Sequence, residues 1–438
     1  MDVNRVVGRI PSEAALAWSR ARAVTVSPDA ILGGLLMLAA ACGSFQLSGR
    51  IPAPMLQARN WQAHSVWFEA DLPNYVQTMT DRNSRNGVSL VHPLYPLASY
   101  PAVWCFRAAL GLDPLMAIRG FLAVIAALWM AALFCLLRLM GCARTDAALL
   151  SLLAMSSAAA VFWLTVPESY GLGSLTMLLA CGTVLAAPRR AAPAAWHAAI
   201  GASTLGITLT NWVAALLSVF AVVPWRRALR ISLLGFGAVV ALTAMERPFF
   251  HGVLQFPFTD LKRTEFILPE EAGGPVHIVR SLVWHSMVMP EIRVVDRYAR
   301  VRRGAPIMTT QASPVGSGSG WGMAGAWLWA GLLGMGAWSM LRCRQLQRWR
   351  IVVALMLVNQ LALHLCFGEE TFLYALHVMP FLIMVAAFAM LTPARRVARG
   401  LAAGLLVCAA ANNLLQFGHA SRIAQRLDLR HATGVKQP

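Results

Sequence analysis

Acidic residues beside aromatic ones recur at three places in a chain that is otherwise poor in acids. Only 19 of its 438 residues are Asp or Glu. Glu69 and Asp71 lie in the stretch Phe-Glu-Ala-Asp-Leu-Pro-Asn-Tyr, Glu168 follows a proline, and Glu370 precedes Thr-Phe-Leu-Tyr. A carboxylate that is partly withdrawn from water has a raised pKa and can accept a proton near neutral pH. These acids are therefore the first candidates for general-base chemistry.

Each acid also has a purely structural explanation. Asp71 fits a solvated loop, and Glu168 fits a helix cap, because a helix N-terminus favours an acid. Alternatively, Glu168 pairs with Asp71 across one cavity, where two carboxylates could hold an acceptor and a divalent cation, or position a cationic group. Glu370, Tyr374 and His377 are spaced by four and three residues, which predicts one shared helical face. The three residues on that face could form a structural hydrogen-bond network or a ligand site, and the sequence favours neither.

Other polar residues could complete such a site. His92 and Tyr95 belong to a His-Pro-Leu-Tyr-Pro stretch that follows the first acids along the chain. Asn211, with Thr210, separates two short apolar runs and predicts the tip of a helical hairpin. Arg247 could clamp phosphate oxygens, although arginine is so common in this chain that a plain surface charge explains it equally well.

The composition is that of a membrane protein. Hydrophobic residues make up 58% and charged residues 13%, whereas soluble domains carry about 25% charged residues. The net charge of +18 comes from arginines that are grouped between apolar runs, which the positive-inside rule explains better than nucleic-acid binding does. The eight cysteines have no metal-site spacing and are expected to be small core residues. The preference for arginine over lysine is typical of a GC-rich bacterium.

Apolar runs that could cross a bilayer, which takes roughly 20 residues in a helix, recur almost from end to end. We predict about eleven transmembrane helices, at residues 30–45, 118–137, 147–166, 171–187, 195–209, 212–223, 231–244, 321–341, 351–367, 372–391 and 401–415. Residues 92–111 contain three prolines and Arg107, and we expect them to lie along the surface. With that choice, Arg138 and Arg144 fall on the cytoplasmic side.

We therefore predict an all-α polytopic protein with a single membrane domain over residues 1–438. Its parts are a cytoplasmic N-terminal segment (1–26), a first periplasmic loop with surface helices (48–116), a large periplasmic loop (247–320) and a periplasmic tail (417–438). The large loop ends in the Gly-Ser run 316–320, which is expected to be flexible. In this arrangement Asp71, Glu168 and Glu370 share the outer surface of a bacterial inner membrane.

At these residues the chain resembles the GT-C superfamily of integral-membrane glycosyltransferases, which includes protein O-mannosyltransferases and the aminoarabinose transferase of lipid A. That family pairs an essential acid in the first external loop with a second acid at the outer end of the third span. Asp71 and Glu168 fall at these two positions, and residues 92–97 look like the family's His-Pro start of a surface helix. The chain lacks the Asp-Glu pair of the mannosyltransferases and the Trp-Trp-Asp motif of oligosaccharyltransferases. It resembles a bacterial member assigned to neither branch.

The resemblance implies an inverting transfer of a hexosyl or pentosyl group from a polyprenyl-phosphate sugar to a cell-envelope glycan, lipid or protein. Asp71 would be the general base, Glu168 would assist, and an arginine would neutralise the leaving phosphate. The candidates for substrate binding are Glu69, His92, Tyr95, Asn211, Arg247, Glu370, Tyr374 and His377. The expected partners are the lipid-linked donor, the acceptor and the bilayer, with no nucleic acid and with a divalent cation as the one candidate cofactor.

Two other functions fit parts of the sequence. A transferase of the O-antigen ligase or polymerase type would use arginine and histidine in a late external loop, where His277, Arg280 and His285 occur. A transporter or flippase of lipids or solutes would share the composition. Transporters, however, usually have broken helices and polar coordination near the midplane, whereas these acids gather at one surface.

Overall fold

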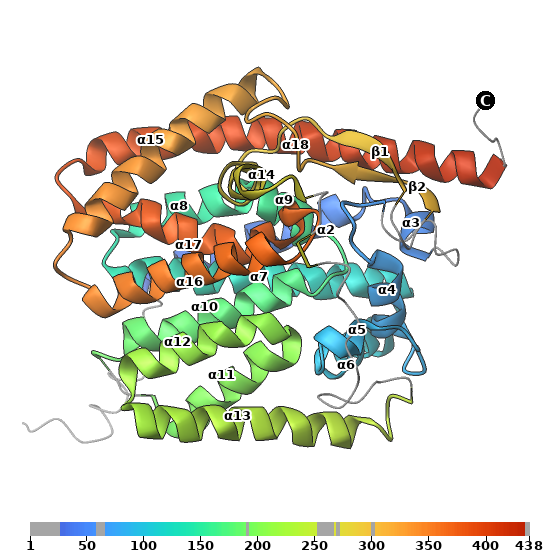
Figure 1. Ribbon diagram of the computed structural model, residues 1–438, viewed down its shortest axis with the longest axis horizontal. Helices are drawn as coiled ribbons and strands as arrows, with labels where there is room; N and C mark the ends of the chain where they lie inside the picture. The colour runs from blue at the N-terminus through green and yellow to red at the C-terminus, as the bar shows by residue number, and fades with distance from the viewer. Residues whose placement is uncertain are drawn as a thin grey trace, which may run out of the picture.

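The chain folds into a bundle of helices that run largely side by side (Figure 1). The structure is a computed structural model that describes residues 27–57, 66–189, 192–251, 267–268, 272–298 and 303–433. The bundle consists of α2 (Pro28–Ser48), α7 (Pro114–Met140), α8 (Arg144–Ser156), α9 (Ala158–Trp163), α10 (Tyr170–Ala186), α11 (Ala194–Ile207), η2 (Leu209–Asn211), α12 (Trp212–Val222), α13 (Trp225–Glu246), α15 (Gly320–Arg342), α16 (Gln347–Cys366), η6 (Thr371–Tyr374), α17 (Ala375–Ala387), η7 (Phe388–Leu391) and α18 (Arg395–Thr433).

Shorter elements occupy the connections. They are α3 (Ala53–Gln57), α4 (Leu72–Thr80), α5 (Val88–Val91), α6 (Tyr95–Leu110), α14 (Pro275–Arg280), the π-helical turn η5 (Ser281–His285) and the strands β1 (Arg293–Tyr298) and β2 (Arg303–Thr309). The two strands pair antiparallel, with Arg293 opposite Thr309. Helices α3 to α6 and this hairpin gather at one end of the bundle, on the right of Figure 1.

Six helical segments among the described residues are long and apolar enough to cross a membrane. They are α2, α7, α13, α16, the continuous unit from η6 to η7, and α18 as far as Leu427. Helix α10 and the η2–α12 pair are apolar but shorter. The prediction of a mostly helical membrane protein is thereby confirmed, whereas the count of about eleven spans stays a prediction.

Sequence signals at its two ends define α7, the longest of the early helices. The Asp113 carboxylate accepts hydrogen bonds from the amides of Leu115 and Met116, and Pro114 occupies the first turn. Both features favour a helix start because the first amides of a helix have no partner within it. Gly141 ends the helix with φ of 102°, a left-handed conformation that glycine adopts without a steric cost.

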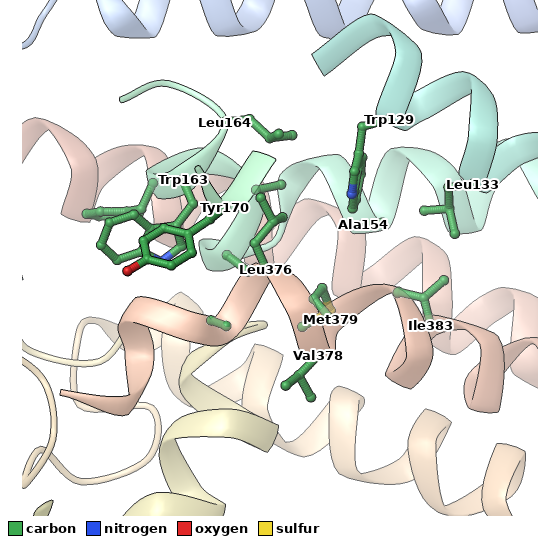
Figure 2. Packing of buried hydrophobic residues seen from close by; sticks show 14 of the residues in the cluster. Trp129, Leu133, Ala154, Trp163, Leu164, Tyr170, Leu376, Val378, Met379 and Ile383 are labelled. Atoms are coloured by element: carbon green, nitrogen blue, oxygen red, sulfur yellow. The ribbon is translucent and has the colours of Figure 1, made fainter. Parts of the chain in front are cut away.

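Helix α17 lies at the centre of the bundle and is buried on all sides. The indole of Trp129 in α7 donates to the Ser174 hydroxyl in α10 (2.9 Å), which in turn donates to the Leu376 carbonyl (2.8 Å). In Figure 2, Trp129, Leu376 and Met379 lie among the packed side chains of this region. This chain of hydrogen bonds fixes the relative positions of three helices, because hydrogen bonds are directional whereas apolar packing is not.

A cluster of buried rings, here called the aromatic cluster, fills the bundle near the end that holds α3 to α6. It consists of Trp67, Phe68, Phe162, Phe372 and Phe417. Phe68 contacts Phe372 edge to face at 5.4 Å between ring centres, and Phe162 contacts Phe417 at 5.3 Å. The cluster thus joins the segment before Asp71 to helices α9 and α18.

At the opposite end of the bundle, two carboxylates pair with arginines of neighbouring helices. Asp29, at the start of α2, lies 3.0 and 2.5 Å from its two arginines, and Asp146, in α8, is fully buried between two others. The four arginines are Arg138, Arg144, Arg395 and Arg399. We call this the ion-paired end, and the end that carries α3 to α6 the site end.

The prediction that residues 316–320 are flexible is wrong. The Gly318 carbonyl accepts a hydrogen bond from the Gln416 side chain (2.7 Å), and the Ser319 hydroxyl donates to Asn412 (2.8 Å). Polar side chains of α18 therefore hold the run in place, a contact between distant residues that glycine and serine content does not reveal. Helix α18 also continues past residue 417, so the expected tail is helical as far as Thr433.

Candidate functional site

Asp71 and Glu168, 97 residues apart in the chain, meet at the site end. The amide of Asp71 donates to Oε1 of Glu168 (3.2 Å), and the amide of Ser169 donates to its Oε2 (3.1 Å). Asp71 immediately precedes α4, whereas Glu168 lies in the bend between α9 and α10. The structure thus brings together the two residues that the sequence singled out as a catalytic pair.

The two carboxyl groups differ in exposure. Glu168 is only 3% exposed, whereas Asp71 is partly exposed as a residue, although its Oδ1 atom is buried. Burial, and next the nearby Asp71 carboxylate, raise the pKa of Glu168 well above its usual value, although the two amides oppose that shift. Within the described ranges, no arginine forms an ion pair with Glu168. Glu168 is therefore suited to hold the Asp71 backbone, and the partly exposed Asp71 is the better placed of the two to meet a substrate.

A chain of hydrogen bonds extends from the acids to the histidine of the His-Pro stretch. Tyr75 donates to the Ser169 hydroxyl (3.3 Å), which lies 3.5 Å from Nε2 of His92. Nδ1 of His92 lies 2.7 Å from the Ile207 carbonyl, so this nitrogen carries the proton and Nε2 accepts. Tyr95 packs edge to face on Tyr75 at 5.2 Å between ring centres. His92 and Tyr95 thus join the predicted pair.

The backbone just before Asp71 is strained. Phe68 and Glu69 have φ of 47° and 66°, in the left-handed region that side chains other than glycine seldom adopt. Phe68 is completely buried in the aromatic cluster, which holds the strained turn in place. Such strain is found where a backbone position is fixed for function. Glu69 itself is only half-buried, two residues before Asp71.

A second polar group lies one helix further into the bundle. The Asn211 amide lies 3.3 Å from Nε2 of His377, and Thr208 lies 3.3 Å from Nδ1 of His92. Gly173 makes this approach possible, because a β-carbon there would come within 2.9 Å of both Asn211 and His377. The expected hairpin tip at Asn211 is confirmed as the turn η2 between α11 and α12. Among the described residues, the buried Oδ1 of Asn211 accepts no hydrogen bond.

Tyr374 belongs to this second group through its neighbours. Its ring stacks on His364 at 4.1 Å and meets Tyr170 edge to face at 5.9 Å, and Tyr170 also contacts the ring of His377 at 5.6 Å. Figure 2 shows Tyr170 beside Trp163, so the tyrosine also borders the apolar core. Tyr374 and His377 are thus close, as their spacing predicted.

Glu370 does not share their face, and that part of the prediction is wrong. The residue has an extended backbone before the 3-10 turn η6, so helical spacing does not apply to it. Its buried carboxylate accepts hydrogen bonds from the hydroxyl of Thr309 and from the amide and hydroxyl of Thr310 (both 3.1 Å). Burial raises its pKa, and these hydrogen bonds oppose the shift. Glu370 therefore anchors the end of the hairpin.

Among the described residues, the arginine and histidine candidates of the large loop form no hydrogen bond or ion pair with Glu168 or Glu370, although the turn that holds His285 contacts η6. Arg247 is exposed at the end of α13. His285 is fully buried, and burial, followed by the charge of Arg280, lowers its pKa to about 3. Arg280 donates to the Ser313 carbonyl (3.4 Å). A buried neutral histidine beside a structural arginine gives little support to a ligase-type site in this loop.

Four residues of the site were missed from the sequence: Tyr75, Ser169, Thr208 and His364. Each is an ordinary residue for a helix end or interior, and only the packing of distant segments brings it to the acids or to His377. The described residues contain no group of three or more His, Cys, Asp or Glu that could hold a metal ion.

Comparison with known proteins adds no further constraint on this arrangement. No family model, no curated protein and no solved structure matches the chain. The functional conclusion therefore depends on the geometry of the site and on the resemblance of the sequence motifs.

Proposed function

We propose that the protein is a glycosyltransferase that moves a sugar from a polyprenyl phosphate to a cell-envelope acceptor. The observation that carries the proposal is the contact of Asp71 with Glu168 at one end of an apolar helical bundle. The carboxyl group of Glu168 is buried and held by backbone amides, and Asp71 beside it is a partly exposed residue. This is the division between a positioning acid and a general base that an inverting transfer needs.

In the proposed reaction, the Asp71 carboxylate takes the proton from an acceptor hydroxyl. The hydroxyl oxygen then attacks the anomeric carbon from the face opposite the phosphate. The bond from that carbon to the phosphate oxygen breaks, its electron pair stays on the oxygen, and polyprenyl phosphate leaves. Glu168 acts as a positioning residue, because it accepts a hydrogen bond from the amide of Asp71 itself.

The proposal includes an orientation and a fold. The site end would face the periplasm of a bacterial inner membrane, and the ion-paired end, with its four arginines, would face the cytoplasm, in accordance with the positive-inside rule. About eleven spans with a GT-C-like layout would then connect the two ends. In support, helix α6 has only 16 residues and many exposed apolar side chains, which suits a helix that lies on the membrane surface.

The test is to incubate purified protein with mannosyl, arabinosyl and aminoarabinosyl polyprenyl phosphates and to measure release of polyprenyl phosphate. Asp71→Asn should lower turnover by about 1,000-fold with the active donor, since a general base contributes roughly 100- to 10,000-fold. Asp81→Asn is the matched control, because Asp81 is an exposed acid at the other end of α4. Its carboxylate accepts a hydrogen bond from the amide of Asn83.

Equal turnover in wild type and Asp71→Asn would contradict the proposal. So would uptake of a solute or lipid into sealed vesicles with no glycosyl product, which would favour the transporter. Loss of activity in Asp81→Asn as large as that in Asp71→Asn would remove the special role of the pair.

A further inference from the structure

A cleft with three arginines opens at the site end, on residues that take no part in the Asp71–Glu168 site. Its volume is about 520 Å³. The lining residues are Gly49, Arg50, Ile51, Pro52, Ala53, Arg119, Gly418, Ser421, Arg422 and Gln425. Three chain segments supply them, namely the connection from α2 to the start of α3, the second turn of α7 and the outer part of α18. None of the lining residues is acidic.

The positive charge of the cleft is not balanced from within the described part of the protein. Among the described residues, Arg50, Arg119 and Arg422 form no ion pair. The Nε atom of Arg119 is buried and donates no hydrogen bond to the described residues, while its Nη1 faces only the sulfur of Met116 at 3.4 Å. Arg119 as a whole is half-buried, but a buried guanidinium N–H without an acceptor is unfavourable. The cleft is therefore built for an anion from outside the chain.

Geometry restricts where that anion comes from. Helix α2 ends at Ser48 and α7 begins at Pro114, so Arg50 and Arg119 lie where two apolar spans end. The apolar side chains of Leu38 and Phe45 are exposed on the part of α2 that leads to Arg50. An anion carried on an apolar chain would place its charge in the cleft and its tail along α2.

Helix α18 is suited to form the outer wall. Its 39 residues extend about 58 Å, whereas a bilayer core is about 30 Å thick, so its last turns project past the spans. Gly418, Ser421, Arg422 and Gln425 repeat at the helical spacing of one face. A neighbouring face, with Phe417, packs into the aromatic cluster.

We infer that the cleft binds the phosphate of an anionic bilayer phospholipid, held by Arg50, Arg119 and Arg422. Arginine suits this role because its planar group binds phosphate through two parallel hydrogen bonds. The volume exceeds that of a phosphate group and admits a glycerol head group as well. The inference does not depend on the transferase proposal, because the two sites share no residue.

The experiment is native mass spectrometry of the delipidated full-length protein, titrated with phosphatidylglycerol. Wild type should bind it at least tenfold more tightly than Arg50→Gln/Arg422→Gln does, and Arg50→Lys/Arg422→Lys should recover part of the affinity. Both side chains are exposed, so the thermal midpoint should not change. Arg107→Gln is the control, because Arg107 is also an exposed arginine at the site end, in the last turn of α6.

Three further titrations of the same protein distinguish the possible ligands. Zwitterionic phosphatidylethanolamine should bind at least tenfold more weakly than phosphatidylglycerol, because it lacks the net negative charge. Inorganic phosphate should also bind at least tenfold more weakly, because it lacks the apolar chain. Polyprenyl phosphate should not compete with phosphatidylglycerol. Equal affinity of the double glutamine variant and wild type, or efficient competition by polyprenyl phosphate, would overturn the assignment. Neither result would depend on turnover at Asp71.

Discussion

The two ends of the helical bundle use buried carboxylates in opposite ways. At the ion-paired end, Asp146 is fully buried and lies against Arg395 and Arg399, so its charge is compensated. At the site end, Glu168 is almost as buried but accepts hydrogen bonds from backbone amides. A paired carboxylate joins helices, whereas one that is held without a cation keeps a raised pKa. The same residue type thus indicates structure at one end and chemistry at the other.

Among the substitutions of buried side chains, the largest effect on this contrast is expected from Glu168→Gln. Glutamine keeps the shape but turns an NH2 group towards one of the two backbone amides, so the position of Asp71 is lost. We expect kcat/KM to fall about 100-fold, which is comparable to the loss of other groups that position a catalytic residue. The loss is measured as turnover of the variant and of wild type with the active donor.

Glu370→Gln is the matched control for that change, because Glu370 is also buried at the site end but anchors the hairpin. It should lower the thermal midpoint and cost less activity than Glu168→Gln. The reverse order of the two activities would contradict the assignment of both acids.

The next effect concerns the ion-paired end. Asp146→Asn leaves Arg395 and Arg399 without their charged partner and should destabilise the fold by about 2 kcal/mol, the range for hydrogen bonds to charged groups. The measurement is the thermal midpoint in detergent, together with turnover per folded molecule. An unchanged midpoint would show that these ion pairs do not hold the helices.

The pH dependence of stability should distinguish the two ends further. Because the pKa of Glu168 is raised in the folded state, that state binds a proton over a pH range where the unfolded chain has released it. The contribution of Glu168 to the free energy of unfolding therefore falls as pH rises from about 4.5 through the folded pKa. Thermal midpoints of Glu168→Gln should show a weaker fall than wild type, and identical slopes would argue against a raised pKa.

The smallest effect is expected from Tyr75→Phe, which removes one hydrogen bond to Ser169 but keeps the ring packed on Tyr95. The net value of a hydrogen bond is about 1 kcal/mol, so kcat/KM should fall roughly fivefold at most. A loss as large as that of Glu168→Gln would mean that the tyrosine itself takes part in the reaction.

The sequence predicted some features of the molecule because they depend on composition and local spacing. Apolar runs predicted the helices, the turn at Asn211 followed from two short runs, and Asp71 and Glu168 were paired on the assumption that both lie at one end. The hairpin, the anchoring of Gly318 by α18, and the partners of Glu370 depend on contacts between distant residues. No local pattern specifies such contacts. The same holds for Tyr75, Ser169 and the arginine cleft.

The most direct measurement compares Asp71→Asn and Asp146→Asn, one neutralised acid at each end, for both turnover and thermal midpoint. We predict a crossed result. Asp71→Asn should lose about 1,000-fold in release of polyprenyl phosphate and keep its midpoint, whereas Asp146→Asn should lose stability and keep its turnover per folded molecule. Parallel losses in both variants, or full turnover in Asp71→Asn, would contradict the assignment of chemistry to the site end.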